Sequence, residues 1–162
     1  MKLKGLQPIV GSRTDVLILG SFPGEMSLRK QEYYAHPRNL FWDIMECIVG
    51  TGRNKDYPSR IQHLKNSGIC LWDVLKSCNR DGSLDTRIRN GHVNNFNSFL
   101  SKHKVRVIFF NGKKSAEAFN RNVVPGLKYS INSHALPSTS PANTRMTKEE
   151  KFRRWCLVKK YL

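Results

Sequence analysis

The amino-acid sequence predicts an α/β protein of three layers (α/β/α), in which a central, mainly parallel four-stranded sheet lies between two layers of helices. Short apolar runs with strand character alternate along the chain with segments of helical period, which is the pattern of a parallel sheet covered on both faces. The chain has 162 residues, 39% of them hydrophobic, which is enough to bury a core of ordinary size. We therefore expect a single domain over residues 1–162.

The first half of the chain supplies two strands and two helices. Residues 15–20, DVLILG, form a short apolar run that ends in glycine, as in a central parallel strand. Residues 39–49 carry apolar side chains every three or four positions, which predicts a helix. The helical period continues over 57–66 and stops at Gly68, and residues 68–75, GICLWDVL, form a second run of strand length.

The second half supplies the remaining elements. Apolar side chains on one side of residues 94–103 predict a helix. Residues 105–110, VRVIFF, are β-branched and aromatic, so they give the clearest strand signal in the chain. A short helix over 115–120 and a fourth strand over 126–131 follow. The chain ends in a basic helix, predicted over 148–162, whose apolar side chains face inward.

Three segments follow predicted strands and meet at the edge where ligands of parallel sheets bind, beyond the carboxyl ends of the strands. They are residues 20–24, 111–113 and 133–143. The first, GSFPG, predicts a rigid turn whose amides can point at an anion or a carbonyl oxygen. The last is rich in small hydroxyl side chains and stiffened by two prolines, which suits contacts to phosphate oxygens. The alternative is that both are ordinary connecting loops.

The net charge is +16, and it is unevenly distributed. Residues 101–162 contain 14 basic and 3 acidic side chains, so +11 of the total lies in the last 62 residues. A field of this sign attracts polyanions, which favours a nucleic-acid partner over the alternative of a solvated basic surface. No run of 18 apolar residues occurs and the N-terminus lacks the apolar core of a secretory signal, so we expect an intracellular protein with no membrane partner.

The four cysteines are Cys47, Cys70, Cys78 and Cys156. They form no C-x-x-C pair, and their spacing fits neither a zinc site nor an iron–sulfur cluster. Three of them lie among apolar residues, so we expect buried thiols in a reducing compartment, with no metal and no cofactor. A zinc-dependent base deaminase is excluded as well, because its H-x-E and P-C-x-x-C motifs do not occur.

Three motifs, in order along the chain, carry a resemblance to a known family. They are Gly20-Ser21-Phe22-Pro23-Gly24, then Tyr33-Tyr34-Ala35-His36-Pro37-Arg38-Asn39-Leu40-Phe41-Trp42, then Leu136-Pro137-Ser138-Thr139-Ser140-Pro141. With these motifs the sequence resembles the uracil-DNA glycosylase superfamily and, within it, most closely the DNA-deoxyinosine (hypoxanthine-DNA) glycosylases.

This resemblance implies a DNA repair enzyme that flips a deaminated base out of DNA and hydrolyses its N-glycosidic bond, leaving an abasic site. It implies hypoxanthine as the first choice of substrate and uracil as the second. Lys113 is the only lysine in the three edge segments, so we expect a monofunctional hydrolase without lyase activity. We also expect a monomer whose partner is DNA containing deaminated bases.

Two positions depart from the pattern of the superfamily. Phe22 stands where the first motif commonly has Asp or Asn, and Leu136 stands where the later motif often has His or Asn. The polar groups that usually carry the chemistry are therefore missing at both positions. This leaves a second interpretation open, namely a catalytically weak or inactive nucleic-acid-binding module of the same fold.

By resemblance to the deoxyinosine glycosylases, Asn39 is the expected catalytic residue, whose amide oxygen would orient a water toward the anomeric carbon. The alternative role of Asn39 is to cap the helix that follows, and both roles can hold together. The expected base pocket consists of Gly20, Ser21, Phe22, Pro23, Gly24, Tyr34 and Asn111, with Tyr34 as the base-stacking ring. The expected DNA contacts are Lys113, Pro137, Ser138, Thr139, Ser140, Asn143 and Arg145. We assign Tyr33, Phe41 and Trp42 to the core.

Overall fold

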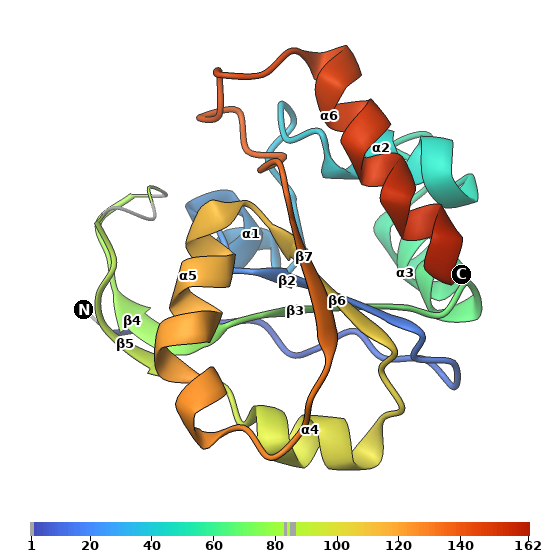
Figure 1. The fold of residues 1–162 in the computed structure, drawn as a ribbon. Coiled ribbons are helices and arrows are strands. Elements are labelled where there is room, and N and C mark those ends of the chain that lie inside the picture. Colours follow the sequence, from blue (N-terminus) through green and yellow to red (C-terminus); the bar gives the residue numbers. More distant parts are fainter. Residues whose placement is uncertain (1, 83, 85–86) are drawn as a thin grey trace.

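The computed structural model describes residues 2–82, 84 and 87–162. Its central sheet consists of β2 (Val16–Gly20), β3 (Ile69–Asp73), β6 (Val107–Asn111) and β7 (Asn132–Leu136). The strands lie in the order β3-β2-β6-β7, and every neighbouring pair is parallel. Helices cover both faces of this sheet (Figure 1). The predicted three-layer α/β class with a four-stranded parallel sheet is confirmed.

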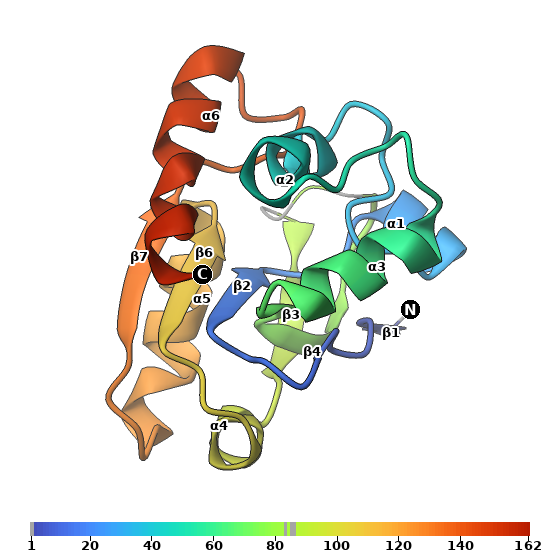
Figure 2. The same ribbon diagram turned by 90° about the vertical axis from the view of Figure 1, so that its right-hand side faces the viewer.

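The helices are α1 (Glu25–Lys30), α2 (Phe41–Val49), α3 (Tyr57–Asn66), α4 (Phe96–Lys102), α5 (Lys113–Asn122) and α6 (Lys148–Trp155). Successive residues of a strand point to opposite faces of the sheet, so β2 feeds two separate cores. Ile18 packs into the core beneath α2, α3 and α6, which lie together in Figure 2. Leu17 and Leu19 pack into the core beneath α4 and α5. Because β2 is buried on both faces, its residues form a continuous apolar run in the sequence.

A second, smaller sheet was not predicted. It consists of β1 (Lys2–Lys4), β4 (Leu75–Asn79) and β5 (Arg89–Val93), in the antiparallel order β1-β4-β5. The predicted strand over 68–75 is in fact divided at Val74, where the chain leaves the parallel sheet as β3 and enters the second sheet as β4. The apolar run is continuous because the residues on both sides of this division are buried.

The predicted strand over 126–131 is wrong. Residues Val124–Gly126 form a 3-10 turn, and the strand that joins the sheet is β7, which begins at Asn132. Among the described strands, β7 pairs with β6 alone, and it is largely exposed, so its sequence NSHAL lacks the apolar pattern of a strand. Leu127 and Ile131, which suggested a strand, pack against the second core from the connecting segment instead.

The predicted C-terminal helix changes its geometry near its middle. The α-helix ends at Trp155 and continues as a 3-10 helix over Cys156–Tyr161.

Cys156 is exposed, and so is Cys47, so the expectation that these thiols are buried is wrong for both. Cys70 and Cys78 are buried and unpaired, as expected. Burial raises the pKa of the Cys70 thiol to about 11.

The remaining helices agree with the predictions to within two residues at either end, except that α1 was not predicted. Within the described residues, no helix combines the length and the apolar composition needed to cross a membrane.

Candidate active site

The carboxyl ends of β2 and β3 bring Gly20 and Asp73 side by side, since these two residues are register partners in the parallel sheet. A Cβ on Gly20 would overlap the Asp73 carboxylate and would lie 3.6 Å from the hydroxyl oxygen of Tyr34. Glycine is therefore required at position 20, because only its lack of a side chain lets these groups approach the turn. Asp73 is 4% exposed. Sequence reasoning missed Asp73, although its place at the end of an apolar strand was a signal that could have found it.

The 20–24 turn is fixed to the neighbouring strands. The amides of Val74 and Leu75 donate to the carbonyl oxygens of Gly20 and Ser21, at 2.9 and 3.0 Å. The guanidinium of Arg80, which is 7% exposed, donates to the carbonyl oxygen of Pro23. These contacts hold the turn in one conformation at the edge of the sheet.

Phe22, expected as a wall of the base pocket, points into the protein. Its ring is 6% exposed and packs in a small apolar cluster with Leu75 and Cys78. The guanidinium of Arg80 lies 5.1 Å from the centre of the ring. Leu136 is also buried, in the core beneath α2 and α6. Both side chains are apolar and pack into the interior, so the polar groups of the site come from other residues.

Asn39 lies at the start of α2, with its side chain held in place. Its Oδ1 accepts a hydrogen bond from the amide of Phe41 at 3.0 Å, which satisfies one of the open N–H groups at the helix start. The guanidinium of Arg53 donates to the backbone carbonyl oxygen of Asn39. On the other side, the amide of Leu40 donates to the carbonyl oxygen of Thr139 at 3.0 Å. The N-cap position itself is Leu40, so Asn39 satisfies the first helical amide from one residue before the cap. This bond holds the carboxamide, while Arg53 and the Leu40–Thr139 bond hold the backbone around it.

Tyr34 stacks on Phe41, with ring centres 3.9 Å apart and an angle of 22° between the planes. Its backbone has a φ of 55°, in the left-handed region that bulky residues rarely adopt. Such strain persists only where surrounding contacts hold it, and residues in this state cluster at functional sites. Phe41, Trp42 and Tyr33 are buried in the core, as expected. Tyr34 alone of this aromatic group is half-buried at the site.

Asn111 and Thr139 bind each other through two hydrogen bonds. The amide nitrogen of the Asn111 side chain donates to Thr139 Oγ1, and the Thr139 backbone amide donates to Asn111 Oδ1, both at 2.9 Å. Thr139 is fully buried. Gly112 has a φ of 95°, and a Cβ there would lie 3.0 Å from Ser138 Cβ. This pair therefore ties the end of β6 to the loop that follows β7.

The loop after β7, residues 137–143, is held by its own hydroxyls and by α6. Ser138 Oγ accepts from the amide of Ser140, and Ser140 Oγ accepts from the amide of Ala142, both at 3.2 Å. Lys151, which is 3% exposed, donates from Nζ to the carbonyl oxygen of Asn143 at 2.7 Å. Burial lowers the pKa of Lys151. Sequence reasoning missed Lys151, because one lysine among many in a basic helix has the pattern of a solvated side chain.

The remaining expected DNA contacts lie around this loop. Ser138, Ser140, Pro137 and Asn143 are partly exposed, and Arg145 is exposed. Lys113 is exposed at the start of α5, where Nζ lies 3.6 Å from a carboxylate oxygen of Glu117.

Comparison with known proteins gives a consistent result. The family model of the uracil DNA glycosylase superfamily matches residues 8–160. A hypoxanthine DNA glycosylase of Methanosarcina barkeri is 37% identical over 93% of this chain and 94% of its own length. A hypoxanthine DNA glycosylase of Methanosarcina acetivorans is 36% identical over 90% of each chain. The solution structure of an M. acetivorans protein provisionally named a uracil DNA glycosylase matches with a TM-score of 0.84 and 32% identity, covering 99% of both chains.

Proposed function

The chain belongs to the uracil DNA glycosylase superfamily, and we propose that it is a DNA glycosylase that removes hypoxanthine from DNA by hydrolysing the N-glycosidic bond. The two relatives named hypoxanthine DNA glycosylase, similar over nearly the whole chain, support this substrate. The observation that carries the proposal is the carboxamide of Asn39, held by the first amide of α2 next to the backbone bond from Leu40 to Thr139 in the 137–143 loop.

In the proposed reaction, Asn39 orients the attacking water. An amide has no useful basicity, so its contribution is to hold a water in line with the anomeric carbon while the sugar develops oxocarbenium character. One lone pair of Oδ1 is engaged by the Phe41 amide, and the other remains for a water. Backbone amides of the 20–24 turn would stabilise negative charge on the departing purine. The reaction leaves an abasic site. Lys113 is engaged with Glu117 at the site's margin, so we propose no lyase step.

We propose that Tyr34 and Asp73 select the base. Flipping a base costs a few kcal/mol of stacking, and a ring in the pocket recovers about 1–3 kcal/mol. Hypoxanthine carries a hydrogen on N1, which a carboxylate can accept, whereas N1 of adenine carries none. The Asp73 carboxylate at the end of β3 is such an acceptor. Uracil presents an equivalent N–H, so it is the proposed second substrate.

A non-catalytic DNA-binding module is the second candidate. The observation in its favour is the apolar side chain at both Phe22 and Leu136, where relatives in the superfamily commonly have polar residues. Such a module would bind DNA through the same loops without releasing a base.

Base release from labelled duplexes tests the proposal. Each duplex contains one hypoxanthine or one uracil, and alkali after incubation breaks the strand at any abasic site. We expect breaks with the native protein and a loss of about 10²–10³ in rate for Asn39→Ala, the usual range for one preorganised polar group. Asn39→Ser is the matched control, because serine also caps a helix start.

The outcomes separate the two roles of Asn39. If Asn39→Ser is as inactive as Asn39→Ala while both remain folded, the carboxamide itself is needed. If serine restores activity, Asn39 acts only as a cap. Breaks with neither lesion would favour the binding module.

A further inference from the structure

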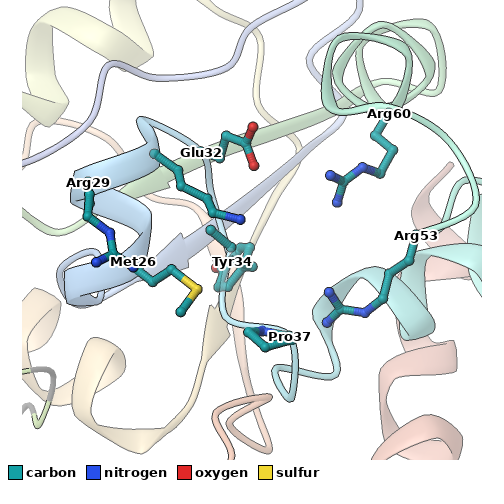
Figure 3. Close-up of a pocket in the computed structure, with 9 residues that line it drawn as sticks. Met26, Arg29, Glu32, Tyr34, Pro37, Arg53 and Arg60 are labelled. Atoms are coloured by element: carbon teal, nitrogen blue, oxygen red, sulfur yellow. The ribbon is translucent and has the colours of Figure 1, made fainter.

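A pocket of about 450 Å³ lies beside residues 36–39, the Asn39 turn, on the side of α1 and α3. The described residues that line it are Met26, Arg29, Lys30, Glu32, Tyr34, Ala35, Pro37, Arg53 and Arg60. Figure 3 shows Arg29 on one side of the central Tyr34. The side chains of Arg53 and Arg60 reach in from the other side. Four of these nine residues are cationic and one is anionic, so this cationic pocket is suited to an anion.

The guanidinium groups of Arg60 and Arg53 are held in place before any ligand binds. Arg60 lies 4.5 Å from the centre of the Trp42 ring and 5.3 Å from that of Tyr57. Its Nε is buried and has no hydrogen-bond partner among the described residues. Burial lowers the pKa of Arg60, and Glu32 opposes this change. Arg60 nevertheless remains partly exposed at the pocket, and a guanidinium fixed in this way is suited to the oxygens of a phosphate group.

The second guanidinium connects the cationic pocket to the candidate active site. Arg53 donates to the carbonyl oxygens of His36 and Asn39 and lies 3.5 Å from a carboxylate oxygen of Asp43. The opposite side of the same turn contacts the 137–143 loop through the bond from Leu40 to Thr139. The Asn39 turn therefore lies between the 137–143 loop and the cationic pocket.

We propose that the cationic pocket binds a phosphodiester group of the substrate DNA, on the side of Asn39 opposite the 137–143 loop. This inference rests on the proposed DNA glycosylase function. A phosphate on each side of Asn39 would fix the strand that carries the flipped nucleotide, or the duplex next to it, against the carboxamide. Phosphate contacts of this kind position DNA without reading its sequence.

The salt dependence of DNA binding tests the proposal. The variant Arg29→Gln/Lys30→Gln removes the two pocket cations that α1 supplies, both exposed, and leaves Arg53 and Arg60 in place. The matched control is Lys102→Gln/Lys104→Gln, which removes the same charge from the end of α4, at the opposite edge of the sheet. Binding to a labelled undamaged duplex and to the same strand alone is measured over a series of salt concentrations, with circular dichroism as a check of folding.

We expect the pocket variant to bind the duplex more weakly, with a slope of log K against log salt less negative than that of the control by about 0.9 per lost phosphate contact. A loss for duplex and single strand alike shows that one strand is enough for the phosphate contact, and a loss for duplex alone shows that the contact needs the second strand; both support the proposal. Equal binding and equal slopes for variant and control would overturn it. So would a variant that loses binding of inorganic phosphate while its DNA binding matches that of the control.

Undamaged DNA is used because it separates the two proposals. If the native protein released no base, the proposed function would fail, while the binding comparison would still report on the cationic pocket. If base release were intact and the slopes were equal, only the pocket proposal would fail.

Discussion

Phe22 and Leu136 are buried, and this explains how the site can do without polar side chains at those positions. Phe22 closes a small apolar cluster beneath the 20–24 turn, and Leu136 belongs to the core under α2 and α6. Polar side chains pointing the same way would be buried without partners, at a cost of about 1–3 kcal/mol each. The two apolar residues therefore stabilise the loops, and the chemistry falls to groups that other elements supply, with Asn39 as the proposed centre.

Tyr34 provides a residue-scale test of the proposed base pocket. Replacing the ring in Tyr34→Leu removes base stacking worth about 1–3 kcal/mol, so we expect substrate capture to fall about 5- to 150-fold. Tyr34→Phe keeps the ring and is expected to stay close to the native protein. The measurement is single-turnover release of hypoxanthine at subsaturating protein. Equal losses for leucine and phenylalanine would contradict a stacking role and point to the hydroxyl near Gly20.

At the scale of elements, burial decides which parts of the fold the sequence could predict. β2, β3 and β6 are buried on both faces and give continuous apolar runs, so all three were found. In the part of the chain that the structure describes, β7 has one neighbouring strand and is largely exposed, and β1 and β5 are largely exposed strands of the second sheet. Pairing with neighbours distant in the chain defines these strands, and a local pattern does not contain that information.

The same limit applies to the candidate site. Asn39 and the loops could be identified because they stand in recognisable motifs at element ends. The mutual bonds of Asn111 and Thr139 join residues far apart in the sequence, and they depend on the register of β6 and β7. Lys151 lies beneath the 137–143 loop only because α6 packs against it. These roles arise from tertiary contacts, which residue types and spacing do not specify.

α3 offers an element-scale prediction of pH dependence. Asp56 caps this helix by accepting from the Ser59 amide at 2.9 Å and from the Ser59 hydroxyl at 3.0 Å, and these bonds lower the pKa of its carboxyl. The ionised carboxylate therefore stabilises the fold above the unfolded pKa of about 3.9, and this contribution is lost as the pH falls through the folded pKa. We expect Asp56→Ala to unfold at lower urea concentration than the native protein at about pH 7, with the difference shrinking in acid.

Asp56→Asn is the control for this prediction, because asparagine keeps the cap acceptor without the charge. Its difference from Asp56→Ala is expected to be independent of pH. If the native protein and Asp56→Ala still differed by the same urea concentration of unfolding in strong acid, the effect could not be assigned to ionisation of Asp56.

At the scale of the whole molecule, the architecture collects the functional loops at one edge of the sheet and leaves the other edge to structural connections. The parallel strand β2 ends in the 20–24 turn, and β7 ends in the 137–143 loop, which contacts the residue after Asn39. Arg145 follows this loop before α6 begins. α5 runs back from the end of β6, so Arg121 in its last turn lies toward the opposite edge. The attraction of DNA by the +16 net charge is therefore expected to differ between the two edges of the sheet. The position of a cation, and not the number of cations, should decide whether it contacts DNA.

Arg145 and Arg121 form a matched pair for testing this expectation, since both are exposed and carry the same charge. For the native protein, affinity for an undamaged duplex should fall steeply between about 50 and 200 mM salt, with a log–log slope of about −0.9 for each phosphate contacted. We expect Arg145→Gln to make this slope less negative by about 0.9 and Arg121→Gln to leave it unchanged. Fluorescence anisotropy across the salt series measures both slopes. If the two variants shifted the slope equally, DNA would be attracted by the overall field of the protein, and the edge that carries Asn39 would hold no preferred phosphate contact at Arg145.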